Sequence, residues 1–404
     1  MSQQAAVMTD AERLSWGAPA CPPQALELRD RVTEFVREHV MPHEAELDSG
    51  GVSARALLER LRREARSEGL WGLPLPAELG GAGLSLAEYA HVAEAEGASD
   101  HGPGVLGSPA LLDVKTLVGH ATPTVRELYL PQIADGRMTM CNAMTEPDTP
   151  GSDPALTATR ASREADGSWT IHGRKWFVTG AGDADLAVVL ARTCGAPPST
   201  TGLSLLLVPT SSPGFRVVRE LPVLGAGGQW EIALDGVTVP PDHLLGEPGR
   251  GLRVIGERVR LGRLLRCLRW LGQAERAFTL MRERARSRPA ASGRLADLQL
   301  VQRLVFDALL AIRTTRPLVF EAVSLVDAGL DARVETGLAK VAAARMLQQV
   351  TDAAIQVHGA AGLGPDTPLP ALFRTGRMAR LLDGPDELHV TAVARRVLHY
   401  APLL

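Results

Sequence analysis

Apolar side chains recur every three to four positions in the first third of the chain, with Arg and Glu between them. One such run extends over residues 26–40 and a second over 57–70. This spacing places the apolar side chains on one face of a helix. Ser85 stands before a further run that reaches Ala95, which predicts a capped helix start. The Gly- and Pro-rich segment 69–83 predicts a loop between these helices.

The pattern changes in the middle third, where short apolar runs alternate with turn residues. The β-like runs cover residues 156–163, 169–173, 187–192, 203–208, 215–218 and 231–234. Helix-length segments do not separate them, which argues against parallel βαβ units. The spacing predicts an antiparallel β-barrel or sandwich of about a hundred residues.

Long amphipathic segments return after Gly251. Their apolar residues predict helices over 253–284, 297–327, 333–358 and 386–398. Four such segments in succession favour an antiparallel four-helix bundle. We therefore predict an α+β fold with an N-terminal α-helical domain (1–137), a middle β domain (138–249) and a C-terminal helical bundle domain (250–404).

Composition and charge exclude several classes of protein. The 404 residues are 45% apolar and 22% charged, as in ordinary globular proteins. A net charge of −3 without a basic tail argues against a nucleic-acid partner. The apolar runs are shorter than the ~20 residues of a membrane span. The four cysteines are scattered and form no metal-type cluster, which favours free thiols in a reducing compartment.

Neither end of the sequence carries a recognisable targeting signal. The polar N-terminus has no apolar signal core, and the final Ala-Pro-Leu-Leu is neither a retention nor a peroxisomal signal. These features predict a cytoplasmic protein.

A Gly-, Pro- and Asp-rich loop over residues 144–153 is the strongest chemical signal. Gly151 lets the backbone pass close to a ligand, and Thr145 and Ser152 supply hydroxyl and N–H groups. Such a loop suits a flat, polar-edged cofactor or a phosphate. An ordinary turn between strands is the competing interpretation.

The loop resembles the first signature of the acyl-CoA dehydrogenase family, through Thr145-Glu146-Pro147 and Gly151-Ser152-Asp153. Residues 173–180 resemble the segment that covers the flavin, and residues 356–362 and 382–387 resemble the second signature. The resemblance extends from about Pro23 to Leu398. It implies the α–β–α fold of that family, an FAD cofactor and dehydrogenation of an acyl-CoA.

The catalytic base implied by the resemblance is Asp383, which lies 27 residues after Gln356. Common members of the family have Glu followed by Gly-Thr here, whereas residues 383–387 read Asp-Gly-Pro-Asp-Glu and resemble a subgroup that uses Asp. An Asp carboxylate reaches about 1.5 Å less than a Glu carboxylate. Either Asp383 or Asp386 could instead cap the following helix. We favour catalysis for Asp383 and capping for Asp386. The other position used for a base in the family aligns with Gly262, which cannot serve.

The resemblance also implies the residues around the flavin and the substrate. The flavin contacts in the same subunit would be Asn142, Met144, Thr145, Gly151, Ser152, Phe177, Val178 and Thr179, and Pro385 and Glu387 would also bind the cofactor. A partner subunit would contribute Arg288, Gln299, Gln356, Gly359 and Ala360. The substrate contacts would be Ser152, Arg260, Arg263 and Gly384. For Arg263, a solvated role among its neighbours Arg258, Arg260, Arg266 and Arg269 is the alternative. Ala291 and Pro385 depart from the family pattern, which has Phe and Thr there.

These features predict FAD-dependent α,β-dehydrogenation of an acyl-CoA to the trans-2-enoyl-CoA in fatty acid metabolism. The resemblance implies a homodimer or homotetramer and an electron-transfer flavoprotein as acceptor. Alternatives are the same reaction on an acyl-carrier-protein thioester, a nitroalkane-oxidase-like or flavin-monooxygenase-like enzyme, and a non-catalytic assembly protein.

Other catalytic motifs are absent from the sequence, including Walker, GxGxxG, HExxH and GxSxG patterns. His358 is interpreted as a packing or backbone-bonding residue. His389 and His399 would lie roughly 15 Å apart on one helix, too far to share a metal. We therefore expect no metal site.

Overall fold

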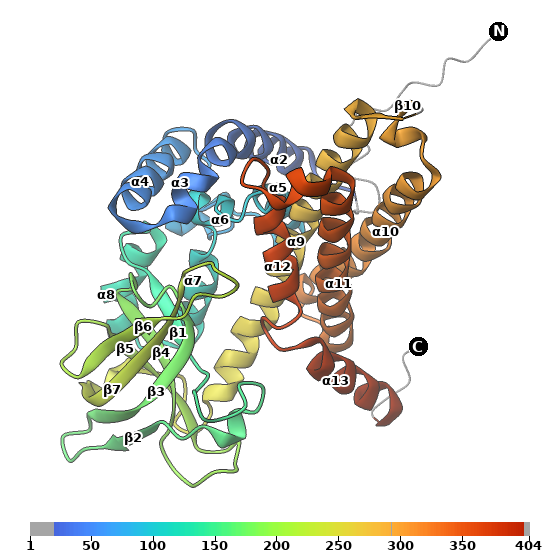
Figure 1. Ribbon diagram of the computed structural model, residues 1–404. Coiled ribbons are helices and arrows are strands. Elements are labelled where there is room, and N and C mark those ends of the chain that lie inside the picture. The colour runs from blue at the N-terminus through green and yellow to red at the C-terminus, as the bar shows by residue number, and fades with distance from the viewer. Residues whose placement is uncertain (1–19, 292, 400–404) are drawn as a thin grey trace. The chain divides into compact units, whose positions relative to one another are not determined.

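The computed structural model describes residues 20–291 and 293–399, and Figure 1 shows their helices and strands. By its contacts the chain divides into two compact units. The first comprises Met1–Pro42, Leu84–Pro103 and Arg263–Leu404, and the second comprises His43–Gly83 and Gly104–Gly262. The domain boundaries predicted at 138 and 250 stay predictions. The features predicted for the two chain ends lie outside the described residues.

The first unit is helical. Its main helices are α2 (Pro23–Phe35), α5 (Leu86–Glu96), α10 (Gln299–Asp327), α11 (Arg333–His358), α12 (Leu369–Ala379) and α13 (Asp386–His399), together with the C-terminal part of α9 (Gly251–Ser287). Its short elements are η1 (Val36–Val40), η6 (Leu295–Asp297), η7 (Gly359–Leu363), β9 (Pro289–Ala290) and β10 (Gly293–Arg294).

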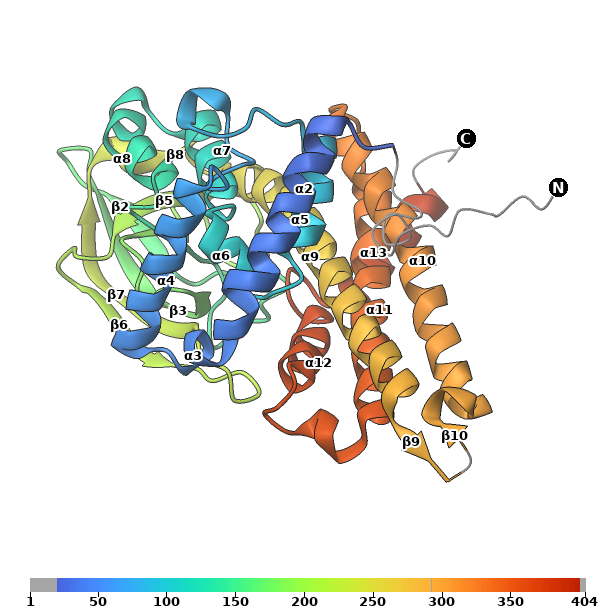
Figure 2. The same cartoon turned by 90° about the horizontal axis from the view of Figure 1, so that it is seen from above.

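Helix α11 is the centre of this unit, because it packs against α10, α12 and α13 (Figure 1). Its buried residues, such as Ala344, Leu347 and Ala353, lie on more than one face. A helix that is apolar on several faces is an interior helix. Helices α2 and α5 pack together, and Figure 2 shows them side by side.

Most helices of this unit follow the sequence pattern closely. Helix α11 has the predicted bounds, and Ser85 caps α5 with a full capping box, its hydroxyl accepting from the Glu88 N–H at 3.2 Å. Helix α12 was not predicted. It begins at Leu369 with Pro370 in its first turn, where a missing N–H is harmless. In the sequence, the prolines on either side of Leu369 are typical of a loop.

A buried ion cluster joins three helices of the first unit. The fully buried Arg316 of α10 contacts Glu94 of α5 and Glu275 of α9, each at 2.6 Å. An arginine fork can satisfy two carboxylates at once. This cluster fixes the relative placement of α5, α9 and α10, which no local pattern in the sequence specifies.

His91 of α5 is expected to make the first unit sensitive to mild acid. Its buried ring lies 4.9 Å from the Phe320 ring, and burial followed by the charge of Arg29 lowers the pKa of His91 from 6.5 to about 4. Between these values only the unfolded chain binds the proton, so stability falls as pH drops from about 6.5 to about 4. At about 1.4 kcal/mol per pKa unit, the loss is on the order of 3 kcal/mol.

Melting temperatures at pH 7.5 and pH 5 check this expectation. The fall in melting temperature between the two pH values should be smaller for His91→Leu than for the wild type. His399→Leu, at an exposed histidine of α13, serves as the control and should fall like the wild type. Equal falls for all three proteins would show that His91 does not cause the acid sensitivity.

The second unit combines helices with a β-sheet. The helices are α3 (Glu44–Ser49), α4 (Gly51–Ser67), α7 (Ala110–His120), α8 (Pro123–Ala134) and the N-terminal part of α9, with α6 (Gly102–Leu106) where the chain enters this unit. Short helical turns are η3 (Ala77–Leu79), η4 (Pro154–Leu156) and η5 (Pro241–His243), and η2 (Met41–His43) lies where the chain first enters this unit. The strands are β1 (Met140–Ala143), β2 (Arg160–Arg163), β3 (Trp169–Thr179), β4 (Leu186–Arg192), β5 (Leu203–Pro209), β6 (Phe215–Glu220), β7 (Gln229–Val239) and β8 (Leu244–Leu245).

The strands form one eight-stranded sheet in the order β6-β7-β3-β2-β4-β5-β8, with β1 also on β4. The pairings are antiparallel except that β1 and β2 each run parallel to β4. An apolar core that includes Ile171, Val189 and Leu206 holds the sheet. Strands β4 and β5 are buried almost throughout, so both of their faces are covered. The predicted β region is present, and β1 is an additional strand directly before the loop over residues 144–153.

Within residues 20–291 and 293–399, no helix combines the length and the apolar character that a membrane crossing demands.

Candidate functional site

A buried ion pair anchors the loop that follows β1. Lys175 of β3 is fully buried, and its Nζ lies 2.9 Å from Glu146 Oε1 and donates to the Met144 carbonyl at 2.9 Å. Glu146 also accepts from the backbone N–H groups of Ala158 and Thr159, at 2.7 and 2.9 Å. Glu146, the Glu of the Thr-Glu-Pro motif, therefore holds the loop in place rather than meeting a ligand.

The pKa values of this pair reflect its burial. Burial lowers the pKa of Lys175 to about 8, although the charge of Glu146 opposes the change. Burial raises the pKa of Glu146, but Lys175 and the hydrogen bonds at Thr159 and Ala158 outweigh it and bring the pKa below its ordinary value. The pair depends on both partners, since either charge alone would be buried without compensation.

A bulge in β3 meets this loop. The pairing with β7 shifts between Lys175 and Val178, so Trp176 and Phe177 leave the ladder, and Phe177 takes a φ of 48° and is half exposed. The Thr145 hydroxyl donates to the Trp176 carbonyl at 2.7 Å, and the Trp176 N–H donates to the Thr145 carbonyl at 3.0 Å. Bulges re-aim side chains in this way near functional sites.

Several predicted flavin residues lie around this junction. A Cβ at Gly151 would come within 2.9 Å of Thr145 Cγ2, so the loop folds back on itself there. Asn142 Oδ1 is buried without a hydrogen-bond partner in the described part of the chain. The Thr179 hydroxyl is hydrogen-bonded to the Gln229 side chain, and Ser152 is exposed. Thus Met144, Thr145, Gly151 and the bulge are brought together.

The sequence pattern did not predict a role for Arg192, which holds the chain after this loop through hydrogen bonds to main-chain carbonyls. Its buried guanidinium donates to the carbonyls of Ala155 at 2.9 Å, Thr157 at 3.2 Å, Ser199 at 3.0 Å and Thr201 at 3.2 Å. An arginine at the end of an apolar strand was the available signal, because a buried charge needs several partners.

In the first unit, Asp383 lies in a strained turn between α12 and α13. Its φ is 54°, unusual for a residue with a side chain, and Gly384 follows at φ 99°. The Asp383 carbonyl accepts from Arg263 Nε at 2.8 Å and contacts His389 Nε2 at 3.2 Å. Since a carbonyl only accepts, Nε2 of His389 carries the proton. The φ of Gly384 is one that residues with a side chain rarely adopt, so the turn favours glycine there.

The carboxylate of Asp383 faces Arg266, a residue that sequence reasoning left among the solvated arginines. Arg266 Nε lies 2.7 Å from Asp383 Oδ2. Oδ2 is buried and has no aligned hydrogen-bond donor in the described residues, so the contact is electrostatic. Three-residue spacing puts Arg263 and Arg266 on one helix face, but it does not single out Arg266, because Arg260 and Arg269 continue the same spacing.

Asp386 anchors the other end of the Asp383 turn. Its buried carboxylate contacts Arg380 at 2.9 Å and Lys340 and Arg345 at 3.4 Å each. Burial raises its pKa, but the hydrogen bond from Arg380 and the charge of Lys340 outweigh this and lower it overall. The carboxylate is occupied by basic side chains, so the predicted capping role gives way to an ion-paired anchor.

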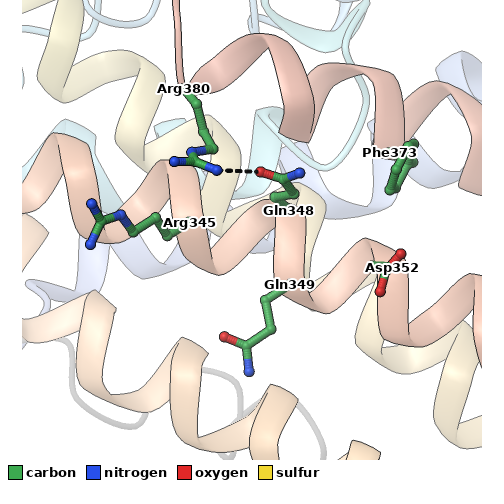
Figure 3. Close-up of a pocket in the computed structure, with 6 residues that line it drawn as sticks. All are labelled: Arg345, Gln348, Gln349, Asp352, Phe373 and Arg380. Atoms are coloured by element: carbon green, nitrogen blue, oxygen red, sulfur yellow. Dashed lines mark hydrogen bonds between the residues drawn. The ribbon is translucent and has the colours of Figure 1, made fainter. Parts of the chain in front are cut away.

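A pocket of about 380 Å³ lies next to this anchor on α11 and α12 (Figure 3). Its lining residues are Arg345, Gln348, Gln349, Asp352, Phe373 and Arg380. Arg380 also donates to Gln348 Oε1 at 3.4 Å, the dashed contact of Figure 3. Arg345 and Arg380 therefore belong both to the pocket wall and to the group that holds Asp386.

The remaining predicted site residues are spread over both units. Gln356 ends the exposed side of α11, and Gly359 and Ala360 begin η7; all three are exposed. Arg288 and Gln299 flank the β9–β10 hairpin and are also exposed. Glu387 is exposed in the first turn of α13, and the Pro385 carbonyl accepts the first hydrogen bond of that helix, from the Leu388 N–H. Val178 is buried in β3. Arg260 lies on the part of α9 that belongs to the second unit.

His358 agrees with its predicted role. His358 Nδ1 contacts the Ala354 carbonyl at 2.8 Å, as expected for a backbone-bonding residue. In the described residues, no three His, Cys, Asp or Glu side chains form a group that could hold a metal ion.

Family models match successive parts of the chain. The acyl-CoA dehydrogenase N-terminal domain matches residues 22–137, the middle domain 141–237 and the C-terminal domain 249–398. A helical domain, a β domain and a second helical domain in this order define a flavoprotein oxidoreductase. The chain belongs to the acyl-CoA dehydrogenase family, whose members bind FAD.

Individual relatives support this assignment. The chain is similar to "Probable acyl-CoA dehydrogenase FadE2" of Mycobacterium tuberculosis, at 36% identity over 93% of this chain and 95% of the relative. It is also similar to "Acyl-CoA dehydrogenase family member 10" of Mus musculus, at 35% identity over 93% of this chain. The chain spans only 37% of that longer protein.

A solved structure has the same fold. The structure of a putative acyl-CoA dehydrogenase from Mycobacterium abscessus matches with a TM-score of 0.88 and 35% identity. The match covers 94% of this chain and 99% of the other chain.

Proposed function

We propose that this protein catalyses FAD-dependent α,β-dehydrogenation of an acyl-CoA thioester to the trans-2-enoyl-CoA, with Asp383 as the base for the α-proton. The observation that carries the proposal is the Asp383 turn. A carboxylate at a strained φ of 54° is held by Arg263 through its carbonyl and by Arg266 through Oδ2. Strain that surrounding contacts maintain is typical of functional positions.

We also propose that the protein belongs to the subgroup of the family that has Asp-Gly-Pro-Asp-Glu at the position of the base. Gly384 is favoured by the turn, and Asp386 is the ion-paired anchor of the segment. Gly384 and Asp386 thus each have a physical role in presenting Asp383, whereas Glu387 is exposed.

The loop and bulge of the second unit fit FAD. Asn142 Oδ1 is buried and unpartnered within the described residues, Thr145 and Gly151 shape the loop, and Phe177 presents a half-exposed ring. These groups suit a flat ring system with polar edges. When bound, FAD supplies the acceptor for the hydride that leaves the β-carbon of the substrate. The proposed contacts in the same subunit also include Met144, Ser152, Val178 and Thr179, and Pro385 and Glu387 are proposed cofactor contacts as well.

We further propose that a second copy of the chain completes the flavin site. Arg288, Gln299, Gln356, Gly359 and Ala360 are all exposed, as residues that serve a neighbouring subunit must be. An arginine fork such as that of Arg288 suits a diphosphate. The protein would then be a homodimer or homotetramer. An electron-transfer flavoprotein as acceptor and a cytoplasmic location complete the proposal.

The chain's own part in the reaction is to position the thioester and take one proton. Ser152, Arg260, Arg263 and Gly384 are the proposed substrate contacts. The backbone N–H of Asp383 is proposed to polarise the thioester carbonyl, which makes the α-proton more acidic. The Asp383 carboxylate then accepts that proton, and the electron pair of the broken C–H bond becomes part of the new double bond.

Anaerobic mixing of the FAD-bound protein with short, medium, long, branched and hydroxylated acyl-CoAs tests the proposal. Loss of flavin absorbance with one class is the expected result, and it would identify the substrate. If no acyl-CoA bleaches the flavin, the proposal is wrong. An acyl-carrier-protein thioester that bleaches it, or rapid reoxidation by oxygen, would then identify the alternative chemistry.

A further inference from the structure

The turn that carries Asp383 is held by two arginines from one helix. Arg263 and Arg266 lie three residues apart on α9, so their side chains share a helix face. Arg263 Nε donates to the main-chain carbonyl of Asp383 at 2.8 Å. Arg266 Nε lies 2.7 Å from the side-chain Oδ2 of the same residue. One arginine thus fixes the backbone of Asp383, and the other faces its carboxylate.

The Arg266 contact differs from a structural ion pair. The side chains of Arg266 and Asp383 are 37% and 24% exposed, whereas the anchoring pair of Asp386 with Lys340 is almost fully buried. A half-buried pair of this kind is partly screened by water, so it contributes less to stability than a fully buried pair does. Stability is therefore a weak reason for placing a cation beside Asp383.

We infer that Arg266 is a positioning residue that sets the orientation of the Asp383 carboxylate toward the substrate. This inference rests on the proposed function of Asp383. The ion pair engages Oδ2 and thereby fixes the rotation of the short side chain, which leaves Oδ1 to receive the α-proton.

The orientation of the carboxylate decides how often it is aligned for proton transfer. Misplacement of a reacting group by about 1 Å can cost on the order of a hundredfold in rate. Loss of Arg266 should therefore slow the chemical step while substrate binding changes little. A lysine at this position keeps the charge but lacks the planar fork, so it should restore part of the rate.

Stopped-flow reduction of the FAD-bound enzyme by its acyl-CoA tests the inference. Arg266→Ala is expected to lower the limiting rate of flavin reduction ten- to a hundredfold, with less than a threefold change in the dissociation constant of the acyl-CoA. Arg266→Lys should recover at least a third of the wild-type rate. Arg333→Ala, which removes the exposed partner of Asp331 in the same unit, is the matched control and should keep the wild-type rate.

A limiting rate within twofold of the wild type for Arg266→Ala would overturn the inference, as would a faster rate. An equal loss in Arg266→Lys and Arg266→Ala would also overturn it, because a charge at this position would then have no guiding effect.

Crystal structures of the FAD-bound wild type and Arg266→Ala, both without substrate, give a readout that does not depend on turnover. The wild type should show one Asp383 rotamer with Oδ2 beside Arg266, and the variant should show a rotated or multiple conformation. The same single rotamer in both proteins would refute the inference. Failure of every acyl-CoA to reduce the wild-type flavin would instead refute the proposed function, and the two failures are therefore distinguishable.

Discussion

Asp383→Asn is expected to slow substrate-driven flavin reduction by about a thousandfold while leaving FAD bound, because general-base catalysis typically contributes 10²- to 10⁴-fold. Asparagine has nearly the same shape as aspartate and tolerates the left-handed backbone that Asp383 adopts at φ 54°. The main-chain carbonyl at position 383 can still accept the hydrogen bond from Arg263 Nε. The substitution therefore removes the negative charge and the proton acceptor without disturbing the turn.

The measurement is anaerobic stopped-flow absorbance with the acyl-CoA that reduces the wild type, together with the FAD content of each protein. Asp366→Asn, at an exposed aspartate of the same unit, is the matched control and should behave like the wild type. Asp383→Glu should keep measurable activity, because a carboxylate remains and only its reach changes. Wild-type reduction by Asp383→Asn with normal FAD content would show that another group is the base.

Lys175→Met is expected to destabilise the protein by about 3–5 kcal/mol, the usual range when one partner of a buried ion pair is removed. Glu146 would keep the N–H groups of Ala158 and Thr159 but lose the cation 2.9 Å away. The Met144 carbonyl would lose its donor as well. Since Met144 and Thr145 belong to the proposed flavin loop, FAD content should fall together with stability.

Urea unfolding and flavin absorbance of the purified protein check this expectation. Lys115→Met removes an exposed lysine of α7 in the same unit and should change neither quantity noticeably. The double variant with Glu146→Gln should recover part of the lost stability, because no buried charge is left without a partner. Unchanged stability of Lys175→Met would mean that the ion pair contributes nothing to the loop.

The two sets of proposed functional residues lie in different units of the chain. Asn142, Thr145, Gly151 and Phe177 belong to the second unit, and Asp383 with its arginines belongs to the first. The two predictions therefore separate roles: Asp383→Asn should affect chemistry without loss of cofactor, whereas Lys175→Met should affect the cofactor loop and stability.

Local pattern was sufficient for most of the fold. The bounds of α11 follow from its apolar spacing, and the capping box at Ser85 and Glu88 follows from two residue types three positions apart. Such features depend on neighbours within one turn of helix, which the sequence displays directly. Helix α12 was not predicted, because prolines usually indicate a loop. Only the structure shows that these prolines lie at the helix start, where they are tolerated.

The sequence by itself determined the family, the order of helical and β regions, and the residue types at the candidate site, since motifs and periodicity are properties of neighbouring positions. Only the tertiary structure decided which charges meet. Arg266 could be told from the other arginines of α9 only when Asp383, more than a hundred positions later, was placed beside it. Likewise, Glu146 and Asp386 proved to be buried anchors because Lys175 and Lys340 lie against them. Such pairings form when folding brings distant segments together, and no local pattern of residues specifies them.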